Sequence, residues 1–288
     1  MLRLRRDILL FPGGKKKALT LSYDDGVTQD QRFIELLNKY GVKCTFNINS
    51  GLMGDRDWLI QPGVDVSHYK FERESIREIY KDHEIAVHSV SHADLTLVPE
   101  GMIAYEISQC RKELEEIVGH LVTGMAYPFG TWNDKVMKTA KCCGITYART
   151  TRQNFGFDLP DDFLAWHPTC HHTETKKMKE LLDIFLQPLE NDYYKSPMIY
   201  SLWGHTYEFD AFEQWGVIEH FLQKASGREE VWYATNGEIC NYVNAAKQLQ
   251  YSATGDYIFN PSCTDIWKLI DQKIYLIPAG KTITIKKP

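Results

Sequence analysis

The chain contains two short clusters of carboxylates and imidazoles, and each follows an apolar segment of strand length. Asp24 and Asp25 are adjacent, while His88 and His92 are four residues apart. Two histidines at this spacing lie on one face of a helical turn and can bind one ion through neutral imidazoles. With Asp25 they make a two-histidine, one-carboxylate set, which suits hydrolytic zinc and also non-heme iron. Adjacent carboxylates can divide the work, because one can hold a metal while the other acts as a base.

Two further segments follow apolar strands and hold groups that could act on a reacting bond. In the first, Pro128 can hold a backbone N–H toward a developing oxyanion, although this segment taken alone is better explained as a rigid turn. In the second, His205 follows the apolar run that begins at Met198. A lone histidine after an apolar strand is more often a structural group, so His205 gains a functional interpretation only together with the other clusters.

The elements that must position these residues alternate between β and α. The predicted strands span residues 18–23, 44–48, 85–87, 124–126, 145–149, 164–166, 198–202 and 231–234. The predicted helices span residues 28–39, 75–82, 99–118, 133–142, 175–186, 212–225 and 237–249. Seven or eight such units favour an α/β barrel with parallel strands, and a doubly wound open sheet is the alternative. The C-terminal strand ends build the active site of a barrel, so the four clusters are expected to meet there.

The segment after residue 250 has a different pattern. Isoleucines alternate with polar residues and with turn signals such as 278–280, which predicts a small β-rich appendage. We therefore expect two domains, a barrel over residues 1–249 and the appendage over residues 250–288. Residues 52–69, which include Gly54, Pro62, Gly63 and His68, are predicted as a long loop.

Composition restricts the partners and the compartment. The formal net charge of −5 over 288 residues makes a nucleic acid or an anionic membrane an unexpected partner. The seven cysteines form no C-x-x-C pair, which favours reduced thiols. No segment approaches the roughly 20 apolar residues of a membrane span. The apolar run at residues 8–11 is shorter than the core of a secretory signal, so a cytoplasmic protein is favoured and secretion is the alternative.

Taken in order, the four clusters resemble the motifs of the polysaccharide deacetylase family, also called the NodB-homology carbohydrate esterases. In that family the first motif is T-F-D-D-G, the second is H-[ST]-x-x-H and the last is L-x-x-H. The resemblance implies that Asp24 is the catalytic base and that His205 is the general acid. It also implies that Asp25, His88 and His92 hold a divalent metal, with Zn²⁺ favoured and Co²⁺, Ni²⁺ or Mn²⁺ as alternatives.

The resemblance covers roughly residues 18–246 and implies a distorted (β/α) barrel. The implied enzyme is a hydrolase of carbon–nitrogen bonds other than peptide bonds. Its partner would be an acetylated carbohydrate, with N-acetyl favoured over O-acetyl. The backbone N–H of Phe129 would bind the oxyanion. The other residues expected around the acetyl group and the sugar are Tyr23, Tyr127, Pro128, Trp166 and Trp203.

The sequence departs from the family pattern at two positions. The third motif is normally R-x-P-[YF], and Ala126 stands where its arginine would be. The fourth motif normally ends in D-W, and here Ala165 precedes the tryptophan. In the family that arginine pairs with the base aspartate, and that aspartate helps to tune the acid histidine. Without a nearby cation, Asp24 is expected to ionise less readily, although the charge of a bound metal acts in the opposite direction.

Other residues could replace the missing aspartate as the partner of the acid histidine. The candidates are Asp158, Asp161 and Asp162. The histidines at 167, 171 and 172 are interpreted as ordinary polar groups of a loop, and the alternative is that they line the site.

Three other functions stay open. An iron oxygenase uses the same ligand set, although such sites are usually built inside antiparallel double sheets. A non-catalytic carbohydrate-binding protein on a deacetylase fold is suggested by Ala126 and Ala165. A deacylase of a small, non-polymeric N-acyl compound would use the same centre. The oligomeric state is left open as well.

Overall fold

A curled parallel sheet forms the centre of the molecule. In the computed structural model, which describes residues 7–189 and 197–285, its strand order is β8-β7-β6-β3-β2-β10-β9, and β11 pairs with the first half of β2. The strands are β2 (Lys17–Asp24), β3 (Thr45–Ile48), β6 (Glu84–Val87), β7 (Gly124–Ala126), β8 (Tyr147–Arg149), β9 (Cys170–His171), β10 (Met198–Gly204) and β11 (Val231–Tyr233). All of these pairs are parallel, so all the C-terminal strand ends lie at one end of the sheet.

The two edges of the sheet are bridged by one extended segment, residues 166–171. Trp166 forms a parallel bridge with Arg149 at the end of β8, and β9 pairs with Leu202 and Trp203 of β10. The sheet therefore curls into a distorted (β/α) barrel, as predicted, and is not an open doubly wound sheet. The strand predicted at 164–166 is reduced to this single bridge, because residues Phe163–Ala165 form a 3-10 helix (η4).

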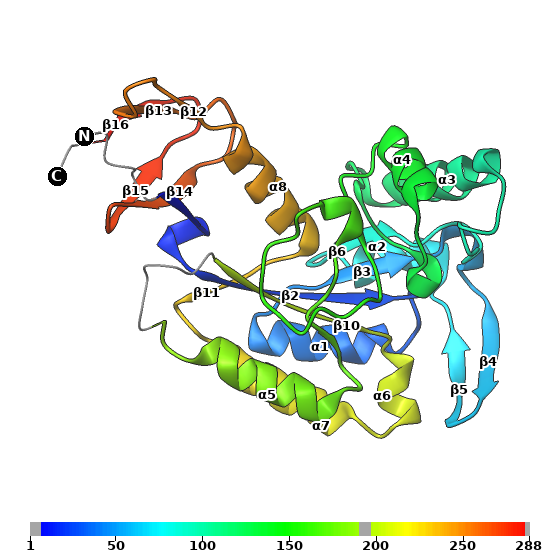
Figure 1. Cartoon of the computed structure of the whole chain (residues 1–288). Helices are drawn as coiled ribbons and strands as arrows, with labels where there is room; N and C mark the ends of the chain where they lie inside the picture. Colours follow the sequence, from blue (N-terminus) through cyan, green and yellow to red (C-terminus); the bar gives the residue numbers. More distant parts are fainter. Residues whose placement is uncertain (1–6, 190–196, 286–288) are drawn as a thin grey trace.

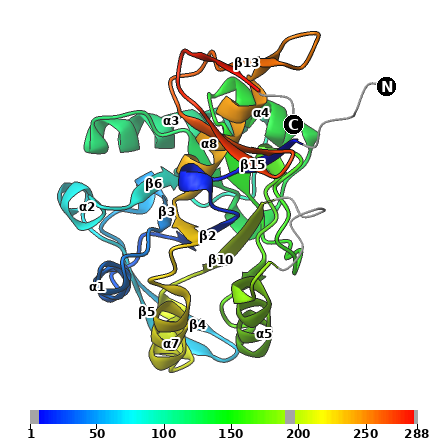
Figure 2. The same ribbon diagram turned by 90° about the vertical axis from the view of Figure 1, so that its left-hand side faces the viewer.

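Helices cover the outside of the curled sheet (Figures 1 and 2). They are α1 (Asp30–Tyr40), α2 (Arg73–Ile79), α3 (Glu100–Val118), α4 (Asp134–Cys142), α5 (Thr175–Leu186), α6 (Tyr207–Ala211), α7 (Trp215–Ala225) and α8 (Asn236–Lys247). Local signals explain their ends: Thr235 and Glu238 form a capping box on α8, and Gly41 ends α1 with φ 65°. No helix in the described ranges is long and apolar enough to cross a membrane.

The segment predicted as a long loop contains a β-hairpin instead. Strand β4 (Arg56–Gln61) pairs antiparallel with β5 (Val64–Tyr69), and the hairpin projects from the barrel beside α6 (Figure 1). Its two-residue turn is Pro62-Gly63, where Gly63 has φ 80°. The alternation of Val64 and Val66 supplies a buried face, which is the period-2 signal that the loop interpretation overlooked.

Antiparallel strands follow α8, as predicted. One sheet has the order β12-β13-β16, with β12 (Gln250–Tyr251), β13 (Tyr257–Phe259) and β16 (Thr282–Thr284). The other has the order β1-β14-β15, with β1 (Asp7–Leu10), β14 (Ile266–Ile270) and β15 (Lys273–Ile277). An N-terminal strand thus belongs to a C-terminal sheet. The domain division after residue 249 stays a prediction.

Candidate active site

The residues of the four sequence clusters come together at the C-terminal ends of the parallel strands. Asp24 ends β2 and Asp25 follows it directly, while His88 and His92 lie in the loop after β6 and not on the expected helical turn. The Asp25 Oδ1 atom lies 3.7 Å from His88 Nε2 and 3.8 Å from His92 Nε2. The three ligand atoms lie within 4.8 Å of one another, which is the spacing a single bound ion requires.

The protonation of the two imidazoles suits a metal. The His88 Nδ1 atom lies 2.9 Å from the carbonyl oxygen of Ala126, which can only accept, so Nδ1 carries the proton and Nε2 presents its lone pair toward Asp25. Burial lowers the pKa of His88 to about 4 and lowers the pKa of His92 as well. Both rings are therefore neutral near pH 7, as metal ligands must be.

The backbone of the site is strained. Eight non-glycine residues in the described ranges have positive φ, and half of them lie in the site. These are Asp25 (φ 83°), Ser89 (φ 63°), His92 (φ 57°) and Phe129 (φ 59°). Such backbone costs about 1–3 kcal/mol per residue and persists where the surrounding structure enforces it, typically at functional sites.

Asp24 has a cation beside it, contrary to the expectation from Ala126. The guanidinium of Arg149, from the end of β8, donates through Nη2 to both carboxylate oxygens of Asp24. Both side chains are buried, and Asn47 Nδ2 also donates to Asp24 Oδ1 at 2.8 Å. Burial alone would raise the pKa of Asp24, but Arg149 and nearby histidines lower it below its ordinary value. Asp24 is therefore ionised near neutral pH.

The partner of His205 is Glu208, and none of the three expected aspartates. Glu208 Oε2 accepts from His205 Nδ1 at 3.1 Å and from the His205 backbone N–H at 3.0 Å. Asp158, Asp161 and Asp162 are exposed, and Asp162 caps η4 instead.

Glu208 also determines the charge of His205. Burial would lower the pKa of His205, but the hydrogen bond and the charge of Glu208 raise it to about 9. The proton on His205 Nδ1 is held by Glu208, and Nε2 lies 3.9 Å from Asp24 Oδ2. Nε2 is thus the nitrogen that faces the site.

His171 and His172 are buried beside Glu208, so for these two the site-lining alternative fits better than the loop interpretation. Their Nε2 atoms lie 3.3 Å and 3.4 Å from Glu208 Oε2. This group resembles a second set of metal ligands, but the backbone N–H of Thr173 donates to His171 Nδ1 at 3.2 Å. Nδ1 is therefore an acceptor, and the proton on Nε2 faces the carboxylate, so His171 acts as a donor to Glu208. His167 is half-buried and contacts Thr150, which agrees with an ordinary polar role.

Most of the aromatic residues expected around a substrate pack beneath the strand ends. Tyr23, Tyr127 and Trp166 are at most 2% exposed, and Trp203 lies under the Arg149 guanidinium at 4.6 Å. These side chains, and the buried Pro128, belong to the packed core at the strand ends. Phe129 differs, because it is 60% exposed and its ring lies 4.5 Å from that of His92.

His68 of β5 and Lys70 directly after it also reach the site, and sequence reasoning missed both. His68 Nε2 lies 3.0 Å from Asp25 Oδ2, and Lys70 Nζ lies 3.8 Å from Asp25 Oδ1. Burial would raise the pKa of Asp25, but Lys70 and His68 hold it well below its ordinary value. No local spacing links these residues to the ligand motifs, since their approach depends on how the hairpin packs.

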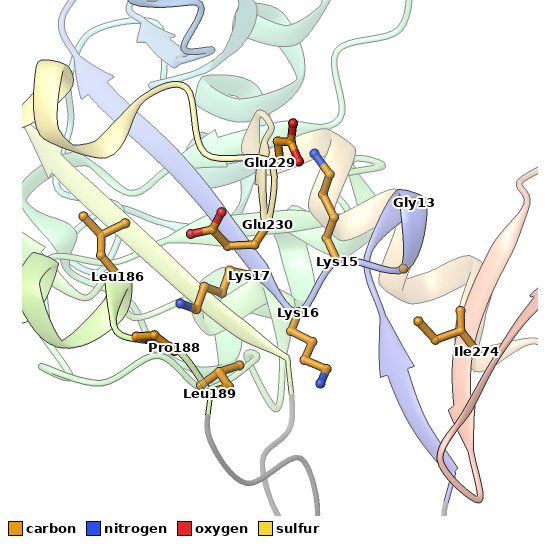
Figure 3. Close-up of a pocket in the computed structure, with 11 residues that line it drawn as sticks. Gly13, Lys15, Lys16, Lys17, Leu186, Pro188, Leu189, Glu229, Glu230 and Ile274 are labelled. Carbon is orange, nitrogen blue, oxygen red and sulfur yellow. The ribbon is translucent and has the colours of Figure 1, made fainter.

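A cavity of 730 Å³ lies at the opposite end of the barrel, where β2 and β11 begin (Figure 3). Two of its three lysines donate to backbone carbonyls. Lys15 Nζ donates to the carbonyl of Val231 at 3.1 Å, and Lys17 Nζ donates to that of Gln187 at 2.7 Å. This cavity is separate from the candidate active site.

Comparison with known proteins identifies relatives of one kind. Residues 12–148 match the family model described as polysaccharide deacetylase. The chain is 26% identical over 146 residues to a chitin deacetylase of Pestalotiopsis sp, covering 50% of this chain and 45% of that protein. It is 24% identical over 139 residues to the Bacillus subtilis protein YxkH, assigned to the polysaccharide deacetylases, covering 47% of this chain and 45% of that protein. The chain thus spans less than half the length of both relatives.

A solved structure shares the fold. A Mycobacterium smegmatis protein assigned as a polysaccharide deacetylase superimposes with a TM-score of 0.60 and 18% identity, over 83% of this chain and 94% of that chain.

Proposed function

The chain belongs to the polysaccharide deacetylase family, and on this premise we propose that it is a metal-dependent hydrolase that removes acetyl groups from a carbohydrate. The observation that carries the proposal is the convergence of Asp25, His88 and His92 within 4.8 Å at the C-terminal strand ends. We favour an N-acetyl substrate, because a protonated His205 can donate a proton to the amine that leaves when an amide is hydrolysed.

Asp25, His88 and His92 would hold the ion, and Zn²⁺ suits this set of oxygen and nitrogen donors, with Co²⁺, Ni²⁺ or Mn²⁺ as alternatives. A divalent ion bound there lowers the pKa of a water from about 15.7 toward about 7 and polarises the acetyl carbonyl. The remaining chemistry belongs to side chains and backbone groups of this chain.

Asp24 is the proposed base. Its carboxylate accepts a proton from the attacking water while the hydroxyl adds to the acetyl carbon. Arg149 keeps Asp24 ionised at neutral pH, which a base requires, although the ion pair also weakens its basicity. The backbone N–H of Phe129 is the proposed donor to the oxyanion that forms on the former carbonyl oxygen.

His205 is the proposed acid. Its Nδ1–H is held by Glu208, so Nε2 carries the proton that passes to the sugar nitrogen as the carbon–nitrogen bond breaks. Acetate and a free amine are the products. Arg149 pairs with the base, and Glu208 pairs with the acid histidine. They take the roles of the family's arginine and aspartate, which Ala126 and Ala165 cannot fill. Their presence favours catalysis over a purely binding role.

The test is acetate release from a panel of N-acetylated and O-acetylated glycans by zinc- or cobalt-loaded protein. Asp24→Asn should reduce release by about 10²–10⁴-fold, the usual contribution of a general base. The variant should leave metal binding in place. Wild-type protein that binds one metal per chain and yet releases no acetate from any member of the panel would contradict the proposal. That outcome would point to a carbohydrate-binding role or a small N-acyl substrate.

A further inference from the structure

His68 contacts the oxygen of Asp25 that faces away from the other two ligands. Asp25 Oδ1 points toward His88 and His92, whereas Oδ2 lies 3.0 Å from His68 Nε2. This distance is that of a hydrogen bond, in which the carboxylate oxygen accepts and His68 Nε2 donates. Oδ1 thus faces the other two ligands, with Lys70 Nζ 3.8 Å away, while Oδ2 is held by His68.

The hairpin that carries His68 is joined to the loop that carries Asp25 by backbone hydrogen bonds. Val27 and Lys70 form an antiparallel bridge, and the N–H of Thr28 donates to the carbonyl of Tyr69 at 2.8 Å. On the other side of His68, Gln29 Nε2 donates to the carbonyl of Ser67 at 2.9 Å. The backbone of His68 is therefore held in register with the backbone just after Asp25.

Packing holds the imidazole as well. Val64 and Val66 on the same face of β5 are buried with Val27 and Tyr207. The His68 ring meets the Tyr207 ring edge to face, with centroids 4.9 Å apart. Only 19% of the His68 side chain is exposed, so it has little freedom to leave Asp25.

Asp25 needs such support. Its φ of 83° is strained for a non-glycine residue, and its carboxylate must keep Oδ1 aimed between two imidazoles. Partners of a ligating carboxylate orient it for the ion, and their loss typically weakens metal binding about 10–100-fold.

We propose that His68 is a positioning residue of the metal centre, which holds the Asp25 carboxylate with Oδ1 toward the ion. The β4–β5 hairpin is then a structural part of that centre and more than a surface insertion. This inference rests on the proposed function, because it takes Asp25 to be a metal ligand.

The test measures the affinity for Zn²⁺ alone, by competition with a chromophoric chelator, in the full chain. His68→Ala should weaken Zn²⁺ binding about 10–100-fold. His68→Gln should stay within a few-fold of wild type, because its amide nitrogen reaches the same position, whereas the shorter His68→Asn should resemble the alanine variant. His120→Ala is the matched control, since His120 is exposed and away from the site, and it should change nothing.

Co²⁺ absorption separates positioning from direct ligation. In Co²⁺-saturated His68→Gln, which keeps a hydrogen-bond donor to Asp25 but has no imidazole, the band positions should match those of wild type. A changed spectrum in this variant would overturn the inference by making the His68 imidazole a ligand. Wild-type Zn²⁺ affinity in folded His68→Ala, or equal affinities of the Gln and Asn variants, would also overturn it. In those cases a wild type that binds Zn²⁺ and releases acetate leaves the proposed function standing. A wild type that binds no Zn²⁺ refutes both.

Discussion

The guanidinium of Arg149 lies against both carboxylate oxygens of Asp24, although 125 positions separate the two residues in the chain. Arg149 ends β8 and Asp24 ends β2, and three other strands lie between these two in the sheet order. Only the curl of the sheet brings them together across the mouth of the barrel. Both side chains are buried away from water, so each charge is stabilised mainly by the other.

Removal of the arginine alone should therefore destabilise the folded protein. Arg149→Met leaves a buried carboxylate without its cation, and we expect the free energy of unfolding to fall by about 3–5 kcal/mol. The double variant Arg149→Met/Asp24→Asn should recover part of this loss, because an amide is cheaper to bury than a carboxylate. Urea unfolding of both variants checks this. Equal midpoints for the single and double variants would show that the two side chains are not coupled.

The alkaline limb of the pH–activity profile should depend on Glu208. His205 must be protonated to act as an acid, and its pKa is raised to about 9, so activity should persist to alkaline pH and fall as the pH rises through about 9. Glu208→Gln removes the charge, and the limb should then move down toward the ordinary histidine pKa of about 6.5. The pH profile of kcat/KM measures this shift. Asp162→Asn, at an exposed position, is the control, and an unmoved limb in Glu208→Gln would contradict the assignment.

Metal removal should affect stability and activity together. A chelator should abolish acetate release and lower Tm, and added Zn²⁺ should restore both. An ion at 100 times its Kd stabilises the folded state by about 2.7 kcal/mol. His88→Ala should lose this stabilisation. A Tm that responds to Zn²⁺ as strongly in His88→Ala as in wild type would place the ion elsewhere.

Gly51 should be needed for the geometry of the segment between His88 and His92. A Cβ at this position would lie 2.6 Å from Val90 Cγ1 and 2.8 Å from the Val90 carbonyl oxygen, and the backbone atom cannot yield without moving the segment between His88 and His92. We expect Gly51→Ala to destabilise the fold by about 1–3 kcal/mol and to weaken Zn²⁺ binding. Thermal unfolding and chelator competition measure the two effects.

The matched control is Gly101→Ala in α3, where an added Cβ meets nothing within 4 Å. This variant should be neutral or more stable by up to about 1 kcal/mol, since alanine is the better helix former. If both glycine variants behave alike, the close approach of Gly51 to Val90 is not what holds the segment.

The sequence by itself determined the barrel and the place of its site. Alternating strand and helix patterns are local properties, and they predicted the parallel units and the β-rich C-terminal segment. The pairing of His88 with His92 was also local, because both lie in one loop. Glu208 was within reach of sequence reasoning too, since it follows His205 by three positions on the first turn of α6. The family pattern instead directed the expectation to an aspartate near Trp166.

Only the tertiary structure decided what surrounds the two aspartates. Arg149 meets Asp24 because the sheet curls, and His68 meets Asp25 because a hairpin taken for a loop packs against Val27 and Tyr207. Neither contact follows from spacing along the chain. Local patterns specify which way a strand runs and where it ends, whereas the curvature of the sheet and the packing of inserted elements determine which distant side chains meet there.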